Sequence, residues 1–226
     1  MGEIWAIRHP VSIWNELEIH QGQRPDEPGL SSLGFQQAFR IARFLSHFPI
    51  LKLWSSPLPR AMQLALVIRR SRHPPLNIFI EPGLMEITNG VVDGLSYAEI
   101  QAKFPDGWDK WHQGVIDQPC FPGGESAKEA AERGVRTLRK ISYLSFPLPE
   151  NHYGPGDGIV IIISHGTLLG LTSTSLMGRS LEEHQTFRQD NGCINFLRWA
   201  LMGLEVSSVN FTGHLGDTDF SPRIEL

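Results

Sequence analysis

Five side chains with catalytic potential follow successive apolar segments of this 226-residue sequence. In chain order they are Arg8, His9, Arg60, Glu86 and His165. If the apolar segments are parallel strands of one sheet, their carboxyl ends meet at one edge, which is where open α/β sheets bind ligands. The sequence therefore predicts a site that combines two imidazoles, two guanidiniums and one carboxyl group.

This combination suits phosphoryl transfer without a metal ion. A neutral imidazole, whose reference pKa is about 6.5, is a competent nucleophile near pH 7. Guanidinium groups bind phosphate oxygens in bidentate geometry, and a second imidazole adds positive charge if it is protonated. A carboxylic acid that protonates the leaving oxygen contributes roughly 10²–10⁴-fold to the rate. We therefore expect one imidazole of this set to attack a phosphoryl group, with charge stabilisation supplied by side chains.

Each of these residues also has an ordinary structural interpretation. A single histidine at a strand end is more often structural than catalytic, and Arg60 and Glu86 could be solvated surface charges. Their coincidence at successive strand ends favours a common site. The remaining histidines show no paired metal-ligand spacing, and we interpret them as structural or exposed. They are His20, His47, His73, His112, His152, His184 and His214.

The elements expected to hold these side chains alternate between strand and helix. Short apolar segments predict strands over 4–7, 51–54, 77–80 and 159–163, and two final strands over 193–200 and 205–211. Helical spacing of apolar residues predicts helices over 38–45, 61–68, 126–144 and 167–177. The third of these begins with a capping-box pattern, Ser126 followed by Glu129. This order favours right-handed parallel crossovers and an α/β fold, with a mostly parallel central sheet flanked by helices.

A segment over 82–125 interrupts this alternation. It is rich in glycine, proline and tryptophan and predicts only short helical stretches. We interpret it as a small insertion that caps the site. Loops are expected over 21–29, over 151–158 and after residue 212. Because no repeat or linker is evident, we expect residues 1–226 to form a single domain.

Composition excludes several classes of protein. The net charge is −4, and no run of basic residues interleaves with aromatic ones, so neither nucleic acid nor an anionic membrane is expected as a partner. The two cysteines, Cys120 and Cys193, predict neither a disulfide framework nor a cysteine zinc site. The longest apolar run, over 159–163, is too short to span a bilayer, and the N-terminus lacks a secretory signal. We expect a cytoplasmic protein.

Several longer motifs in this sequence resemble those of the histidine phosphatase superfamily, the phosphoglycerate mutase-like group of branch 1. They run in order from residue 4 to about residue 200. The motifs are IRHPVSIWNELEIHQGQRPDEPGLSSLGFQQA, SSPLPRAMQLA, LMEITNGVVDGLSYAEIQAKFP, FPGGES and IVIIISHGTLLGL. Each motif is weak alone, but five in the family's order are specific, and they imply the family's α/β fold with a cap over the site.

The resemblance also implies residue roles. His9 corresponds to the nucleophile that becomes phosphohistidine. Arg8, Arg60 and His165 correspond to the residues that bind the transferring phosphoryl group.

Three further positions match the family's motifs. Asn15 resembles an asparagine that also touches phosphate, and Gly166 follows the second histidine as it does in the family. Glu86 resembles the proton donor to the leaving group, which later serves as the base that activates water.

This sequence departs from the family's pattern at three places. Pro10 replaces the glycine that follows the nucleophile, which removes a backbone N–H and restricts φ. Val11-Ser12 replaces an acidic-hydroxyl pair, and Val92-Asp93 stands where many relatives carry Trp-Glu. None of these changes alters the nucleophile itself.

The composition of the cap favours hydrolysis. A mutase must hold a bisphosphate, yet the cap offers only Lys103, Lys110 and His112 as cations. Its apolar residues, most of which we expect to pack the cap onto the body, are Val91, Val92, Leu95, Tyr97, Phe104, Trp108, Trp111 and Phe121. We therefore predict a cofactor-free phosphomonoester hydrolase acting on a small phosphorylated metabolite. A phosphoglycerate mutase-type phosphotransferase and a phospho-ligand-binding pseudo-enzyme are the alternatives, and the sequence leaves a homodimer open.

Overall fold

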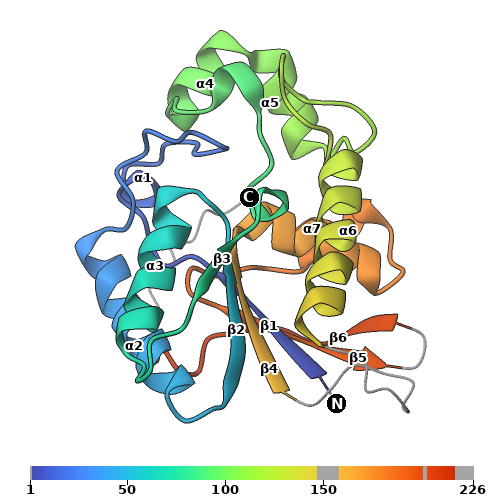
Figure 1. The fold of residues 1–226 in the computed structure, drawn as a ribbon. Helices are drawn as coiled ribbons and strands as arrows, with labels where there is room; N and C mark the ends of the chain where they lie inside the picture. Colours follow the sequence, from blue (N-terminus) through green and yellow to red (C-terminus); the bar gives the residue numbers. More distant parts are fainter. Residues whose placement is uncertain (1, 147–157, 201–202, 217–226) are drawn as a thin grey trace.

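A six-stranded sheet forms the centre of the computed structural model, which describes residues 2–146, 158–200 and 203–216 (Figure 1). The strand order is β3-β2-β4-β1-β5-β6. The strands are β1 (Gly2–Arg8), β2 (Ile50–Ser55), β3 (Ile78–Ile80), β4 (Gly158–Ser164), β5 (Ile194–Ala200) and β6 (Gly203–Phe211). The first four are parallel to one another, whereas β5 pairs antiparallel with both β1 and β6. The predicted mostly parallel α/β fold is confirmed.

Helices cover both faces of the sheet. On one face lie α2 (Ser32–Leu45) and α3 (Pro59–Arg70), and on the other lie α6 (Ala127–Ser145) and α7 (Gly166–Leu176). Strand β1 shows why its sequence is apolar throughout. Ile4 and Ala6 pack in the core beneath α6 and α7, and Trp5 and Ile7 pack in the core beneath α2 and α3. Alternate residues of a strand point to opposite faces, so a doubly covered strand needs apolar residues at every position.

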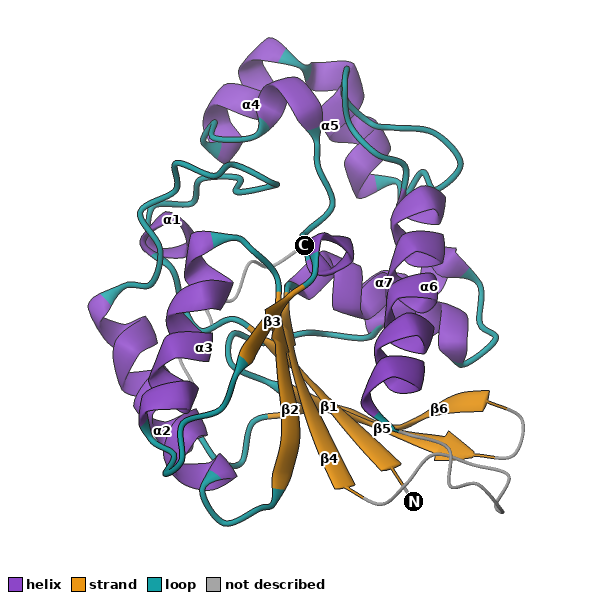
Figure 2. Cartoon of the chain, viewed as in Figure 1, coloured by secondary structure: helices purple, strands orange, loops and turns teal. Residues whose placement is uncertain are grey.

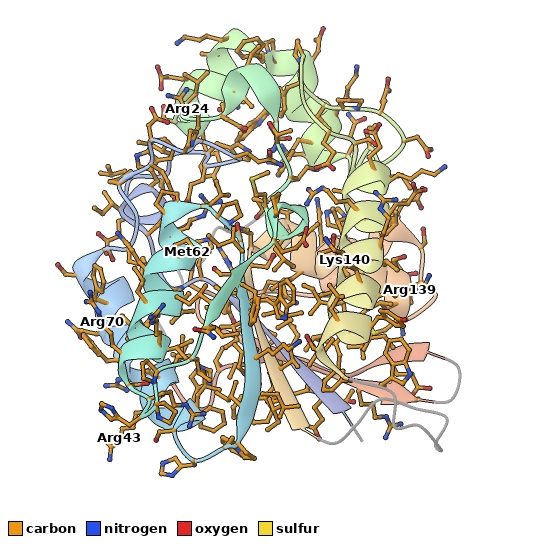
Figure 3. The ribbon with its side chains drawn as sticks, viewed as in Figure 1. Arg24, Arg43, Met62, Arg70, Arg139 and Lys140 are labelled. Carbon is orange, nitrogen blue, oxygen red and sulfur yellow. The ribbon has the colours of Figure 1, made fainter. Side chains whose placement is uncertain are left out.

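Charged side chains lie on the outer surfaces of these helices. Arg43 on α2, Arg70 on α3 and Arg139 and Lys140 on α6 are exposed (Figure 3), and Lys140 forms an ion pair with Glu81 at 2.6 Å. The predicted capping box at the start of α6 is present, because the Ser126 hydroxyl accepts from the Glu129 N–H at 3.2 Å while Glu129 accepts from the Ser126 N–H at 2.9 Å. The local sequence is therefore enough to begin this helix.

The insertion lies over the carboxyl ends of the parallel strands (Figure 1). It contains η1 (Pro82–Leu84), η2 (Gly90–Val92), α4 (Tyr97–Lys103) and α5 (Pro105–His112), joined by long loops (Figure 2). Three buried side chains, Val92, Ile100 and Phe121, form its own small core. Backbone hydrogen bonds between His20 and both Gly94 and Leu95 join the cap to the loop that follows β1.

The structure adds two short elements that the sequence did not predict. These are α1 (Ile13–Glu16) and η3 (Leu181–Thr186), both of which border the site. Neither has enough apolar residues for a periodicity to be visible. Most of the predicted loop over 151–158 lies outside the described residues, and so does the tail beyond residue 216. No described helix is long and apolar enough to cross a membrane.

Candidate active site

The two histidines of the site come from neighbouring strands. His9 follows β1 and His165 follows β4, and because these strands pair in parallel, the two imidazole rings lie 5.2 Å apart between centroids. The His9 N–H also donates to the Ser164 carbonyl at 3.0 Å, which holds the two strand ends together. The predicted meeting of strand ends is therefore observed.

The imidazole of His9 is 2% exposed and is held through both nitrogens. Nδ1 lies 2.7 Å from the Pro10 carbonyl oxygen, and Nε2 lies 3.1 Å from Nε of Arg60. Because a carbonyl can only accept and a guanidinium can only donate, the proton sits on Nδ1 and the lone pair on Nε2. Burial lowers the pKa of His9 well below its usual value, and the charges of Arg60 and Arg8 lower it further. His9 is thus a neutral imidazole whose lone pair is on Nε2.

Arg60 is buried and oriented by the loop over 21–29. Its Nη1 forms an ion pair with Oε2 of Glu27 at 3.0 Å, and its Nη2 donates to the Gly22 carbonyl at 3.0 Å. Glu27 also accepts from the Arg60 N–H at 2.8 Å. Burial lowers the pKa of Arg60 and the carboxylate of Glu27 opposes this shift. Sequence reasoning missed Glu27, because nothing local distinguishes a buried loop glutamate from a solvated one.

Gly22 is required where this loop passes close to the cap. Its φ is +47°, and a Cβ there would lie 2.0 Å from the Asp93 carboxylate. Asp93 in turn accepts from the Gln23 N–H at 3.2 Å and from the Asn89 N–H at 3.0 Å. Asp93, which replaces the glutamate of many relatives, therefore joins the loop to the cap.

Arg8 and His165 complete the cationic side of the site. Arg8 donates through Nη1 to the Gln189 carbonyl, and its buried Nε has no hydrogen-bond partner among the described residues. A Cβ at Gly166 would lie 3.0 Å from that Nε, so glycine gives the guanidinium room. His165 is fully buried, with Nε2 2.8 Å from the Ser56 hydroxyl.

The environment of His165 disfavours positive charge. Burial lowers the pKa of His165 well below its usual value, and Arg60 is the largest of the charges that lower it further. The sequence-based role required a protonated imidazole. A phosphoryl dianion bound between these groups would oppose the shift, so the charge of His165 is coupled to anion binding.

Asn15 lies at the rim of the same site. Its Oδ1 accepts from the Ser12 N–H at 3.0 Å and from Nδ2 of Asn191 at 3.2 Å. Asn191 also donates to the His9 carbonyl at 3.2 Å. Asn191 and Gln189, from the loop before β5, were not predicted, because that loop carries no recognisable pattern.

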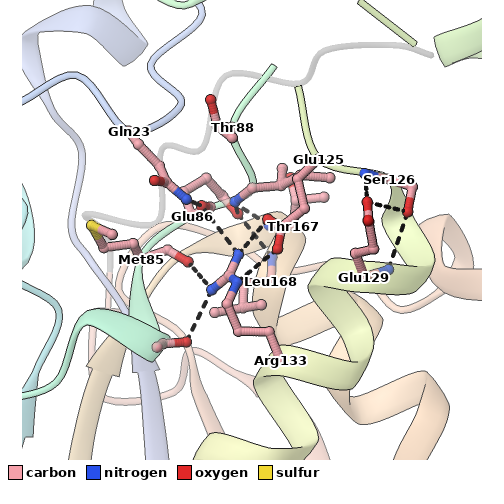
Figure 4. Close-up of polar contacts among 12 residues, drawn as sticks. Gln23, Met85, Glu86, Thr88, Glu125, Ser126, Glu129, Arg133, Thr167 and Leu168 are labelled. Carbon is pink, nitrogen blue, oxygen red and sulfur yellow. Dashed lines mark hydrogen bonds and ion pairs between the residues drawn. The ribbon is translucent and has the colours of Figure 1, made fainter. Parts of the chain in front are cut away.

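The carboxylate of Glu86 lies at the N-terminus of α7 (Figure 4). Its Oε1 accepts from the N–H groups of Ile87 and Leu168, each at 2.9 Å, and its Oε2 accepts from that of Thr167 at 3.1 Å. A helix N-terminus supplies free N–H groups and favours negative charge. Glu86 also lines the cleft, and Nε2 of Gln23, from the loop over 21–29, donates to its backbone carbonyl at 2.7 Å.

Arg133 on α6 holds the segment that carries Glu86 (Figure 4). Its guanidinium donates to the carbonyls of Gly83 at 2.9 Å, Met85 at 2.8 Å and Glu86 at 3.4 Å. Glu125 accepts from it through both oxygens, at 2.8 and 2.6 Å. This network, which sequence reasoning missed, connects α6 with the backbone of Glu86.

These groups open onto one cleft of about 570 Å³. Six of the seven predicted site residues line it, and His165 lies buried beside His9. The six are Arg8, His9, Asn15, Arg60, Glu86 and Gly166. Three of the other histidines, which the sequence analysis interpreted as structural or exposed, also line the cleft: His20, His112 and His184. Among the described residues, no group of three histidine, cysteine or acidic side chains could hold a metal ion.

Comparison with known proteins agrees with this geometry. The model of the histidine phosphatase superfamily (branch 1) matches residues 4–212, so this chain belongs to that family. Phosphoserine phosphatase 1 of Hydrogenobacter thermophilus is 26% identical over 96% of both chains. The probable phosphoglycerate mutase GpmB of Erwinia tasmaniensis is 25% identical over 96% of this chain and 97% of its own. YhfR of Bacillus stearothermophilus, a solved structure at 22% identity, has the same fold, with a TM-score of 0.82 over 95% of this chain and 100% of its own.

The family assignment confirms the predicted class of protein. The chain is a histidine phosphatase-type enzyme, and the names of its relatives agree with a reaction on small phosphorylated metabolites.

Proposed function

We propose that this enzyme hydrolyses phosphate monoesters of small metabolites through a phosphohistidine on Nε2 of His9. The observation that carries the proposal is the contact of Nδ1 with the Pro10 carbonyl at 2.7 Å. This contact places the lone pair of a buried, neutral imidazole on the nitrogen that faces Arg60. Pro10 replaces a glycine of the family motif, yet its carbonyl supplies this orientation, because proline lacks only the N–H.

The reaction has two steps. In the first, Nε2 forms a bond to phosphorus while the bond to the ester oxygen breaks, and Glu86, which takes up a proton when the dianionic ester binds, gives that proton to the leaving oxygen. Arg8, Arg60 and His165 bind the equatorial oxygens, where charge is spread in the transition state. In the second step, water attacks phosphorus, Glu86 takes a proton from it, and the bond to His9 breaks to release inorganic phosphate.

Three side chains supply the charge that a metal ion supplies in other phosphatases, so we propose a metal-independent reaction. Dialysis against a chelator should leave kcat unchanged for the best ester found. A loss of rate that added Mg²⁺ or Zn²⁺ restores would show that the cationic side chains are insufficient.

The cap supports hydrolysis over isomerisation. Lys103 pairs with Glu99 at 3.2 Å, and neither Lys103 nor Lys110 lines the cleft. His112 does line the cleft, and its Nδ1 lies 2.8 Å from the Trp108 carbonyl oxygen. A mutase must retain a bisphosphate while it reorients, and the cap offers few groups for the second phosphate.

The test compares phosphate release with isomerisation. Over a panel of phosphate esters, wild-type enzyme should release inorganic phosphate and form an acid-labile, alkali-stable phosphoenzyme. Incubation with 3-phosphoglycerate should not yield 2-phosphoglycerate at a competitive rate. Fast isomerisation stimulated by a bisphosphate would support the mutase alternative, and binding without turnover would support the pseudo-enzyme.

We also propose that the enzyme acts in the cytoplasm. Cys120 and Cys193 are both free thiols, as is usual in a reducing compartment. Fractionation of the source cells with an antibody to this chain would test the location.

A further inference from the structure

The outer half of the cleft is walled by aromatic side chains. Trp14 comes from α1, Tyr97 from the start of α4, and Trp108 and Trp111 from α5. The Tyr97 and Trp108 rings lie 6.1 Å apart, and His20 meets the Trp111 ring edge-on at 5.4 Å. We refer to Trp14, Tyr97, Trp108 and Trp111 as the aromatic wall. It belongs to the same cleft as His9, so an ester bound through its phosphoryl group would place its alcohol part against this wall.

Three rings of the aromatic wall pack against the core of the cap and also line the cleft. The buried core of the cap is Val92, Ile100 and Phe121, each no more than 4% exposed. Tyr97, Trp108 and Trp111 are only partly buried, and they border the cleft as well as this core. The sequence-based interpretation as packing residues therefore holds for Val92 and Phe121, and the three rings combine packing against this core with a place in the lining of the cleft.

The outer half of the cleft also disfavours a second negative charge. Arg188, which lines it, is ion-paired with Asp190, and Glu18 contributes an exposed carboxylate. Burial lowers the pKa of both His20 and His184, so both imidazoles are neutral at pH 7. Among the described cleft residues beyond Arg8 and Arg60, Arg188 is the one further arginine or lysine, and it already shares its charge with Asp190, which also lines the cleft.

We propose that the substrates of this site are phosphate monoesters whose alcohol part carries a planar aromatic ring system and no carboxylate. The inference rests on the proposed function and names its substrate class. The phosphoryl group lies among Arg8, Arg60 and His9, and the aromatic body lies against the aromatic wall. Rings gain from offset or edge-on contact with other rings as well as from burial of apolar area. A carboxylated alcohol part would add to the negative charge of Glu18 and Asp190, and it would have to compete with Asp190 for Arg188.

The test compares three esters that all leave as alkoxides, so that each needs a proton from Glu86. They are 2-naphthylmethyl phosphate, cyclohexylmethyl phosphate and phosphoserine. We expect kcat/KM to be about tenfold higher for the naphthylmethyl than for the cyclohexylmethyl ester, as the strength of aromatic pairing predicts. Phosphoserine should be the poorest of the three. Equal values for the two apolar esters, or a preference for phosphoserine, would overturn the proposal.

The outcome separates this inference from the proposed function. If wild-type enzyme hydrolyses none of the esters, nor any other in a broad panel, the proposed function itself fails. If hydrolysis depends on His9 but shows no aromatic preference, only the substrate class is wrong.

Variants locate the preference in the aromatic wall. Trp111→Leu and Tyr97→Leu should each lower kcat/KM for the naphthylmethyl ester several-fold more than for the cyclohexylmethyl ester. Tyr143→Leu is the matched control, since Tyr143 lies on α6 outside the cleft and is 72% exposed. It should leave the ratio of the two values at its wild-type level. Melting temperatures should show that both cleft variants fold. If the ratio of kcat/KM for the two esters is then unchanged in both variants, the role of the aromatic wall is contradicted.

Discussion

Nε of Arg60 lies 3.1 Å from Nε2 of His9, so the guanidinium contacts the atom to which we assign the attack. Arg60 is itself held by Glu27 and by the Gly22 carbonyl. The lone pair of the nucleophile is therefore occupied by a cation that cannot protonate it at neutral pH, because a guanidinium does not give up its proton. When a phosphoryl group enters, the same N–H can turn to one of its oxygens, which frees the lone pair for attack.

We expect His9→Ala to abolish turnover of every phosphate ester while leaving the protein folded. Among the described residues, the imidazole whose ring lies beside that of His9 is His165, which is assigned to charge stabilisation. His47→Ala is the matched control, because His47 is exposed and outside the cleft. Phosphate release and circular dichroism should be measured on the same samples. Hydrolysis at close to the wild-type rate by a folded His9→Ala variant would contradict the assignment of His9 as the nucleophile.

Arg60→Lys should lower kcat/KM by roughly 10²–10³-fold, the usual effect of removing a donor to a developing oxyanion. A lysine carries the charge but cannot contact His9, Glu27 and Gly22 at once. Arg139→Lys provides the control on the outer surface of α6 (Figure 3). A rate for Arg60→Lys within twofold of wild type would show that charge alone suffices at this position.

Glu86→Gln should slow phosphorylation of His9 far more for alkyl than for activated aryl esters. An aryl ester leaves as a stable phenolate, whereas an alkoxide needs a proton in the transition state. Single-turnover measurement of the first step is required, because Glu86 also serves as the base for the second step. Equal penalties for both kinds of ester would remove Glu86 as the acid, and Asp93 and Glu99 in the same segment would be tested next.

Arg133→Met should reproduce part of the Glu86→Gln effect without touching the substrate. Its guanidinium holds the carbonyls of the segment ending at Glu86, so its loss should let the carboxyl group drift from the leaving oxygen. The penalty should again be larger for alkyl esters. Arg136→Met, an exposed neighbour on α6, should show no such difference. A uniform loss for both kinds of ester would mean that Arg133 only stabilises the fold.

Folding stability should fall as the pH drops below about 6.5, the pKa of histidine in an unfolded chain. The pKa values of His9 and His165 are lowered in the folded protein, so below that pH the unfolded chain binds protons that the folded one does not. As the pH drops, each histidine lowers the free energy of unfolding by up to about 1.4 kcal/mol per pH unit, until the pKa that it has in the folded protein is reached. Urea unfolding of wild type and His9→Gln in phosphate-free buffer should show a shallower slope between pH 6.5 and 5 for the variant. An identical slope would contradict the lowered pKa of His9.

Much of this site follows from sequence alone. The apolar segments before His9 and His165 specify buried parallel strands, and the carboxyl ends of such strands share one edge of a sheet. This rule was sufficient to bring two histidines, two arginines and a glutamate together. The capping box at Ser126 likewise depends only on residues three apart.

The tertiary structure decided how each side chain is held and what faces it. Glu27 is 33 residues from Arg60, and Asn191 is 182 residues from His9. The course of the loops that bring such partners together depends on packing against the rest of the protein, not on their own residues. The same applies to Tyr97, Trp108 and Trp111, because whether an aromatic ring lies in a core or borders a cleft depends on the surface opposite it. A sequence determines the strands through local periodicity, but the partners of a buried charge and the lining of a cleft are set by contacts between distant segments.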